Sequence, residues 1–292
     1  MEQIFGNENE GGGAAAAMDD IEFPHLRSLK LLRLPELKNF CSAFKDDPDE
    51  QFLFDKKVAL PALEKLEILG GGNFKEIWHP QFSVTSFSQL KILKVANCNK
   101  LLNVIPFNLL QSLRNLEKLC VARCDSVEEI IEVGRLGVEE GNASAVLSQL
   151  RFLVLGKLPK LAHLWWDFPH GALGCRNLTS IHIFECNSLK SVFPHSIASS
   201  LVQLQTLKIV SCQMMETIIA KDRDGDVEII VFPQLRTLVL KNLPKLMGFY
   251  TGRCTQKHET NDKALDESTE EGDLCISIQP LFDDKVCIKF LI

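Results

Sequence analysis

Residues 90–104 read LKILKVANCNKLLNV, and residues 116–130 read LEKLCVARCDSVEEI. Both stretches place an apolar residue or a cysteine at positions 1, 4, 6, 9, 12 and 15. Residues 178–192 (LTSIHIFECNSLKSV) and 204–218 (LQTLKIVSCQMMETI) repeat this spacing without an insertion or a deletion. The chain is therefore built on a short unit with six regularly spaced anchor positions.

Four more copies of the unit differ mainly at the fourth anchor. Three of them have a leucine followed by a proline there, and the fourth has Gly71. The eight copies begin at Leu26, Leu63, Leu90, Leu116, Leu150, Leu178, Leu204 and Leu235. All of them fit the form LxxLxLxxCxxLxxV, which is the pattern of a leucine-rich repeat.

The spacing within one repeat predicts its local structure. The LxL core alternates apolar and polar residues, which is typical of a short strand with one buried face. The later anchors are three residues apart, which favours a short 3₁₀-like, irregular or helical return. One unit cannot bury its own apolar face, so the units must stack. We expect an α/β leucine-rich-repeat solenoid of about eight repeats, curved, with a parallel β-sheet on its concave face.

Composition divides the chain into three parts. Residues 1–20 contain too few apolar residues to pack and are expected to form a disordered N-terminal segment. Residues 21–250 hold the repeats. Residues 251–292 begin as a polar linker and then contain LFDDKV (281–286), which nearly duplicates LFDKKV (53–58) ahead of the second repeat. We therefore expect the start of a truncated further repeat, and a chain that is a fragment or truncated product of a longer protein.

Charge and motif content narrow the classes of function. A net charge of −6 argues against general nucleic-acid binding. The sequence has no apolar run long enough to span a membrane and no secretory signal, so a cytoplasmic location is expected. It also lacks a GxxxxGK[ST] phosphate loop and a nucleophile elbow. We expect no enzyme activity, no cofactor, no metal and no small-molecule substrate.

Four cysteines occupy the fourth anchor: Cys98, Cys124, Cys186 and Cys212. At this position a thiol is a small apolar filler and a weak hydrogen-bond donor, which predicts buried structural thiols. Adjacent repeats stack about 4.8 Å apart, so Cys98 should lie over Cys124, and Cys186 over Cys212, within the reach of a disulfide. Oxidation-prone pairs and a metal site therefore remain as alternatives to the structural role.

Two columns of residues alternate with the strand anchors and should face the concave side, where solenoids usually bind. The first column is Ser28, Lys65, Ile92, Lys118, Phe152, Ser180, Thr206 and Thr237. The second is Lys30, Glu67, Lys94, Cys120, Val154, His182, Lys208 and Val239. Five lysines make this face basic, and an apolar patch accompanies them, which suits an acidic protein partner. The alternative is a solvated strand face whose lysines discourage aggregation.

From these columns and the tryptophans we select candidate partner-binding residues. Tryptophan is enriched at binding hot spots, and Trp166 is preferred over Trp165, which continues a packed stretch. Trp78 is expected to pack against the next repeat. The candidate set is Lys65, Lys94, Lys118, Phe152, Val154, His182, Lys208 and Trp166.

The strings FPHLRSLKLLRLPELKNF (23–40) and FPQLRTLVLKNLPKLMGFY (232–250), together with the cysteine-type repeats, resemble the arrays of a known family. This family is the plant coiled-coil, nucleotide-binding, leucine-rich-repeat disease-resistance proteins, and the resemblance covers residues 21–250. It implies a recognition module for a pathogen effector, a host guardee altered by one, or the receptor's own nucleotide-binding domain. The phosphate loop and the coiled coil of that family are absent here, so only the recognition role carries over.

Other protein classes also use such repeats. They include the substrate-recognition arm of an F-box-type ubiquitin ligase, although no F-box-like helical segment precedes Leu26. They also include extracellular receptors, which would carry an LxGxIP pattern that this chain lacks. A free-standing leucine-rich-repeat scaffold without a specific ligand completes the set of alternatives.

Overall fold

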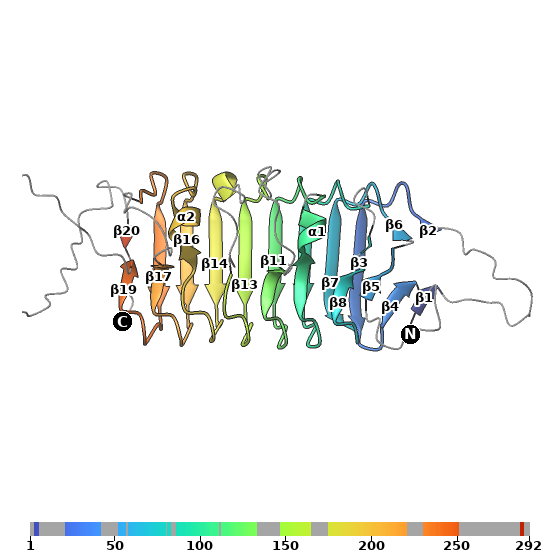
Figure 1. Ribbon diagram of the computed structural model, residues 1–292, viewed down its shortest axis with the longest axis horizontal. Coiled ribbons are helices and arrows are strands. Elements are labelled where there is room, and N and C mark those ends of the chain that lie inside the picture. The colour runs from blue at the N-terminus through green and yellow to red at the C-terminus, as the bar shows by residue number, and fades with distance from the viewer. Residues whose placement is uncertain are drawn as a thin grey trace, which may run out of the picture.

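The LxL core of every repeat folds as a β-strand, and these strands form one long parallel sheet (Figure 1). The strands follow one another across the sheet in chain order. They are β3 (Ser28–Leu34), β7 (Lys65–Gly71), β9 (Ile92–Ala96), β11 (Lys118–Ala122), β13 (Phe152–Gly156), β14 (Ser180–Phe184), β16 (Thr206–Val210), β18 (Thr237–Lys241) and the short β20 (Cys287–Ile288). The first eight belong to the eight predicted repeats, so the predicted parallel solenoid is confirmed.

The computed structural model describes residues 3–5, 21–41, 52–56, 58–79, 81–82, 86–110, 112–132, 147–164, 175–220, 230–250 and 287–288. Trp165 and Trp166 lie outside the described residues, as do nearly all of the segments 1–20 and 251–292. Among the helices of the described residues, none is long and apolar enough to cross a membrane.

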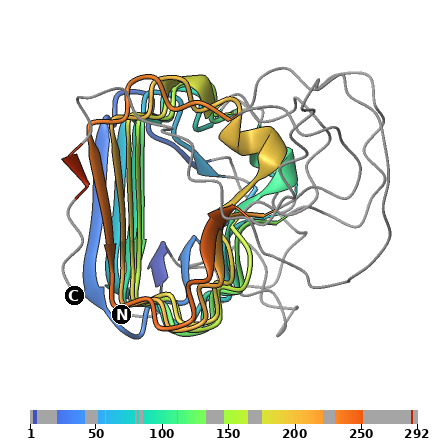
Figure 2. The same ribbon diagram turned by 90° about the vertical axis from the view of Figure 1, so that its left-hand side faces the viewer.

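Short strands that the sequence did not predict occur in the return segments and, as β1 and β2, ahead of the first repeat. They lie on the side of the solenoid opposite the long sheet or close to its ends (Figure 2). Where these short strands pair, they do so in parallel, as in the pairs β10–β12 and β17–β19. The short strands are β1 (Gln3–Phe5), β2 (Ile21–Glu22), β4 (Asn39–Cys41), β5 (Phe52–Phe54), β6 (Val58–Ala59), β8 (Glu76–Trp78), β10 (Asn103–Pro106), β12 (Glu129–Glu132), β15 (Phe193–Pro194), β17 (Thr217–Ala220) and β19 (Gly248–Tyr250).

Helical structure is confined to single turns in the returns of the described residues: α1 (Phe107–Leu110), α2 (His195–Ala198) and the 3₁₀ turn η1 (Cys175–Asn177). The short returns predicted from the three-residue anchor spacing are therefore confirmed. Because each return is so short, one repeat advances by little more than the width of a strand. This keeps equivalent residues of consecutive repeats side by side.

The anchors form one continuous apolar core between the long sheet and the returns. Leu207, Ile209 and Cys212 of an interior repeat are each fully buried. Equivalent anchors at the two ends of the array, such as Leu29 and Leu243, are only partly buried. A repeat thus depends on a neighbour on each side to cover its apolar residues.

Trp78 packs in this core, as expected. Its Nε1 donates a hydrogen bond of 2.7 Å to the carbonyl of Val104 in the next repeat. Its ring also lies edge-on to Phe87 with centroids 4.6 Å apart and stacks on Phe54. Trp78 therefore stabilises the stacking of the second repeat on the third instead of offering a binding hot spot.

At an equivalent position near the end of each of the first eight long-sheet strands, one residue adopts a left-handed backbone conformation; it directly follows the strand in six repeats and is the next-to-last residue of β3 and β7. These residues have φ between 53° and 74°, and only one of them is a glycine. They are Arg33, Gly70, Asn97, Arg123, Lys157, Glu185, Ser211 and Asn242. In five successive repeats the N–H of this residue donates to the last strand carbonyl of the next repeat, at 2.8–3.0 Å. The strained residue therefore links neighbouring repeats.

Truncation of an interior anchor should be costly and should loosen mainly the adjoining repeats. Leu207→Ala is expected to lower the free energy of unfolding by about 2–5 kcal/mol, because it leaves a cavity in a fully buried site. Lys208→Ala is the control, because Lys208 is the next residue of β16 and lies on the opposite side of the sheet. This variant should change the free energy of unfolding by less than about 0.5 kcal/mol. Urea denaturation measures both, and equal losses would show that the strand register is wrong.

Relief of strain at a left-handed position should stabilise the fold. A non-glycine residue there costs about 1–3 kcal/mol, whereas glycine adopts it freely but loses about 0.5–1 kcal/mol through chain entropy. Arg123→Gly is therefore expected to raise the melting temperature, and the β-branched Arg123→Val to lower it. Thermal unfolding followed by circular dichroism measures both variants, and a lower melting temperature for the glycine variant would contradict this role of the conformation.

Candidate functional site

The exposed side chains of the long sheet form the candidate functional site. Within each central strand, buried anchors alternate with partly exposed residues. The described parts of the returns lie behind the sheet (Figure 2), so the partly exposed residues line its other side. We call this side the open face; it corresponds to the concave side of the sequence prediction.

The two predicted columns lie on the open face as direct cross-strand partners. In the first column, for example, Lys118 pairs with Ile92 on one side and with Phe152 on the other. In the second, His182 lies between Val154 and Lys208. Seven of the eight candidate residues are therefore brought onto one surface; the eighth, Trp166, lies outside the described residues.

A third column, which the sequence analysis missed, completes the open face. It consists of Leu32, Leu69, Ala96, Ala122, Gly156, Phe184, Val210 and Lys241. These residues follow the last strand anchor by one position, so the period-2 alternation that revealed the first two columns also places them here. All except Lys241 are apolar or glycine, which makes this edge of the open face markedly less polar than the other two columns.

Phe184 is held in a defined position within the third column. Its ring lies against Gly156 of the neighbouring strand, where the Cβ of any other residue would overlap the ring. A glycine in a strand interior weakens the strand unless another group needs the space. The close approach of Phe184 explains why the sequence has a glycine here.

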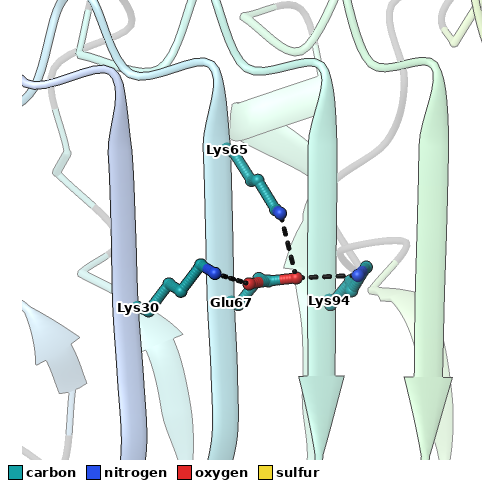
Figure 3. A network of polar contacts seen from close by, with 4 residues as sticks. All are labelled: Lys30, Lys65, Glu67 and Lys94. Atoms are coloured by element: carbon teal, nitrogen blue, oxygen red, sulfur yellow. Dashed lines mark hydrogen bonds and ion pairs between the residues drawn. The ribbon is translucent and has the colours of Figure 1, made fainter.

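Glu67 organises the charges at the β3, β7 and β9 end of the open face (Figure 3). Its carboxylate accepts a hydrogen bond of 2.7 Å from the Nζ of Lys94. The Nζ atoms of Lys65 and Lys30 each lie 3.4 Å from its oxygens. Three of the five lysines that make this face basic therefore share one carboxylate, and two positive charges of this cluster are left unmatched.

The surroundings of Glu67 also explain its acidity. The side chain of Glu67 is only 7% exposed, whereas those of the lysines are 32–52% exposed. The hydrogen bond from Lys94 does most to lower the pKa of Glu67 to about 2, and Lys65 and Lys30 add to this against the opposing effect of burial. Glu67 is thus ionised at any physiological pH.

The middle of the open face combines a large apolar side chain with cations. Phe152 is 44% exposed, and the Nζ of Lys118 lies 5.9 Å from the centre of its ring, in the range of a cation–π contact. On the neighbouring strands His182 and Lys208 are partly exposed. Burial, and then the positive charge of Lys208, lower the pKa of His182, so its imidazole is mainly neutral at pH 7.

Ser180 and His182 form a contact that resembles part of a catalytic pair. Ser180 Oγ lies 3.3 Å from His182 Nε2. A nucleophilic serine needs a histidine that is oriented by a third group and stabilised as an imidazolium. The residues on either side of His182 are Val154 and Lys208, and a lysine disfavours the imidazolium. We therefore interpret this contact as a surface hydrogen bond.

The four anchor cysteines are buried free thiols, as expected. Each Sγ donates to the backbone carbonyl two residues earlier, at 3.4–3.6 Å. Burial raises the pKa of Cys186 to about 12 and also raises the pKa of Cys212. Cys186 and Cys212 therefore carry little thiolate at neutral pH, which favours a structural role over a redox role for this pair. The hydrogen bond between Cys98 and Cys124 raises the pKa of Cys124 and lowers that of Cys98. No group of metal-ligating side chains is found among the described residues.

Comparison with known proteins adds one finding. A family model described as the leucine-rich repeats of RPS2-like plant disease resistance proteins matches residues 62–213, which include the middle of the open face. No curated protein matches the chain.

Loss of the Glu67 charge should destabilise the fold above pH 4. Glu67→Gln leaves three lysines without their shared carboxylate and is expected to cost about 1–3 kcal/mol at pH 7. Because the pKa of Glu67 is lowered on folding, its stabilisation is present above the unfolded value and is lost as the pH falls from about 4.5 to about 2. The difference in the free energy of unfolding between wild type and Glu67→Gln should therefore become smaller as the pH falls through that range.

Glu64→Gln is the matched control for this experiment. The Glu64 carboxylate also contacts two cations, Lys91 at 2.9 Å and Arg27 at 3.7 Å, but it is much more exposed than that of Glu67. Its loss should therefore change stability less. Urea denaturation at several pH values measures both variants; equal effects at pH 7, or a gap that persists at low pH, would contradict the role assigned to Glu67.

Proposed function

Because the chain belongs to the leucine-rich-repeat family of RPS2-like plant disease resistance proteins, we propose that it is the protein-recognition module of a plant intracellular immune receptor. Its partner is a pathogen effector, a host guardee altered by such an effector, or the nucleotide-binding domain of the same receptor. We further propose that it acts in the cytoplasm and works by binding and not by catalysis.

The observation that carries this proposal is the open face itself. Three columns of side chains lie in register across a continuous sheet, and their backbones are held by strand hydrogen bonds on both sides. A partner that docks there orders little of this backbone, so little binding energy is lost to ordering it. The exposed Phe152 beside Lys118 supports binding of a protein surface, because large aromatic side chains beside cations are frequent in interface hot spots.

The family of the chain also bears on the alternatives. Membership in a family of resistance-protein repeats supports an immune receptor over an F-box-type ubiquitin ligase arm or a free-standing scaffold. The three readings predict different partners in the cell. An immune module binds a defence-related protein, a ligase arm copurifies with ligase subunits, and a scaffold has no partner that depends on the open face.

Disruption of the open face should remove the partner without unfolding the protein. Val154→Arg places a long charged side chain in the second column and is expected to reduce recovery of the partner at least about tenfold. Leu102→Arg is the matched control, since Leu102 is an exposed apolar residue of the return between β9 and β10. The measurement is quantitative mass spectrometry of proteins that copurify with the full chain expressed in plant cells.

Two results would contradict the proposal. If the copurifying proteins are unaffected by Val154→Arg, the open face is not the recognition surface. If ubiquitin-ligase subunits copurify with both variants, the chain is a ligase arm. Circular dichroism of both variants establishes that a loss of binding does not reflect unfolding.

A further inference from the structure

The open face is divided into two chemically different parts. At one end, Lys30, Lys65 and Lys94 share the carboxylate of Glu67 (Figure 3). Over β13 to β18 the face presents apolar side chains on adjacent strands, and we call these five residues the central strip: Phe152, Val154, Phe184, Val210 and Val239. We therefore look for the residues that select a partner in the central strip over β13 to β18.

Two lysines flank the central strip without a carboxylate of their own. Lys118 lies on β11 in the first column, and Lys208 lies on β16 in the second. Glu67 is the one acidic residue in the three columns, and it lies on β7, two strands from β11. Neither lysine forms a salt bridge with a described carboxylate; Lys118 lies over the ring of Phe152, and the charge of Lys208 acts on His182. The charges beside the strip are therefore available to a partner.

The spacing of the two lysines limits what can bridge them. The strands β11, β13, β14 and β16 are consecutive in the sheet, so three steps of about 4.8 Å, or about 14 Å, separate β11 from β16. The row of Lys118 reaches β16 at Thr206, two residues before Lys208, which adds about 7 Å along the strand. The two lysines are therefore about 16 Å apart. An extended peptide advances about 3.3 Å per residue. A segment that crosses the strands obliquely would therefore contact both lysines with residues about five positions apart, and the residues between them would lie over Phe152, Val154 and His182.

We propose that the open face binds an extended segment of a protein that carries two acidic residues about five positions apart with apolar or aromatic residues between them. This deepens the proposed function and rests on it. The acidic residues pair with Lys118 and Lys208, and the apolar residues cover Phe152 and Val154 of the central strip. The two unmatched positive charges of the Glu67 cluster favour further acidic residues on the side of the segment that continues toward β9.

The test is a selection from random ten-residue peptides displayed on phage, with the full chain as bait. On the wild-type protein, acidic residues are expected to be enriched at least about fivefold at two positions about five apart, with leucine, phenylalanine or tryptophan between them. On Lys208→Glu, enrichment at one acidic position should be lost and replaced by lysine or arginine. On Phe152→Ala, enrichment of the apolar residues should fall.

Two matched controls keep the selection specific. Lys160→Glu makes the same charge change in the turn after β13, and Leu102→Ala removes an apolar side chain that is 41% exposed in a return segment, close to the 44% of Phe152. Both should select the same peptides as wild type. Melting curves of all variants verify that they are folded.

The proposal is overturned if the wild-type pool shows no enrichment of paired acidic residues, or if Lys208→Glu selects the same pool as wild type. It is also overturned if the full chain binds phosphatidylserine vesicles through Lys118 and Lys208 while the displayed peptides are not retained. A negative result in the peptide selection does not contradict the proposed function if Val154→Arg still removes the cellular partner in the copurification experiment. If Val154→Arg leaves that partner bound, the proposed function itself fails.

Discussion

The rest of the structure depends on one packing constraint: the apolar anchors of each repeat are covered only by the repeats on either side. Interior anchors such as Leu207 and Cys212 are fully buried, whereas Leu29 and Leu243 at the ends are not. Because the contacts are between neighbours, the strands must keep one register along the whole array. The same register brings side chains from repeats 26–34 residues apart into straight columns on the open face.

A second link between repeats is made by the backbone. The left-handed residue near the end of each strand turns the chain toward the return and, in the central repeats, donates its N–H to the next repeat. Arginine, lysine, glutamate, serine and asparagine all occupy this position, so the residue type does not reveal it. The stacking of the repeats imposes this conformation. Each non-glycine site carries a local strain of about 1–3 kcal/mol, which is offset where the backbone N–H gains a hydrogen-bond partner.

The electrostatics of the open face follow from this stacking. A count of lysines indicates a uniformly basic surface, but Glu67 contacts three of them. The hydrogen bond from Lys94, helped by Lys65 and Lys30, lowers the pKa of Glu67 to about 2 against the opposing effect of burial. The positive charges that remain free of carboxylates lie farther along the sheet, beside Phe152 and His182. The function that we propose therefore depends on where charges are paired and not on the number of charges.

The sequence by itself determined the repeat, the parallel solenoid and the first two columns, because a two-residue strand period forces alternate residues onto opposite faces. The same period places Phe184 and Gly156 in the third column, but only the structure shows the ring of one against the other. The tertiary structure also decided that Glu67 draws in Lys30, Lys65 and Lys94, that Trp78 bonds to Val104, and that the returns form strands. These features depend on lateral contacts between different repeats, and the spacing within one repeat does not specify which side chains meet across the sheet.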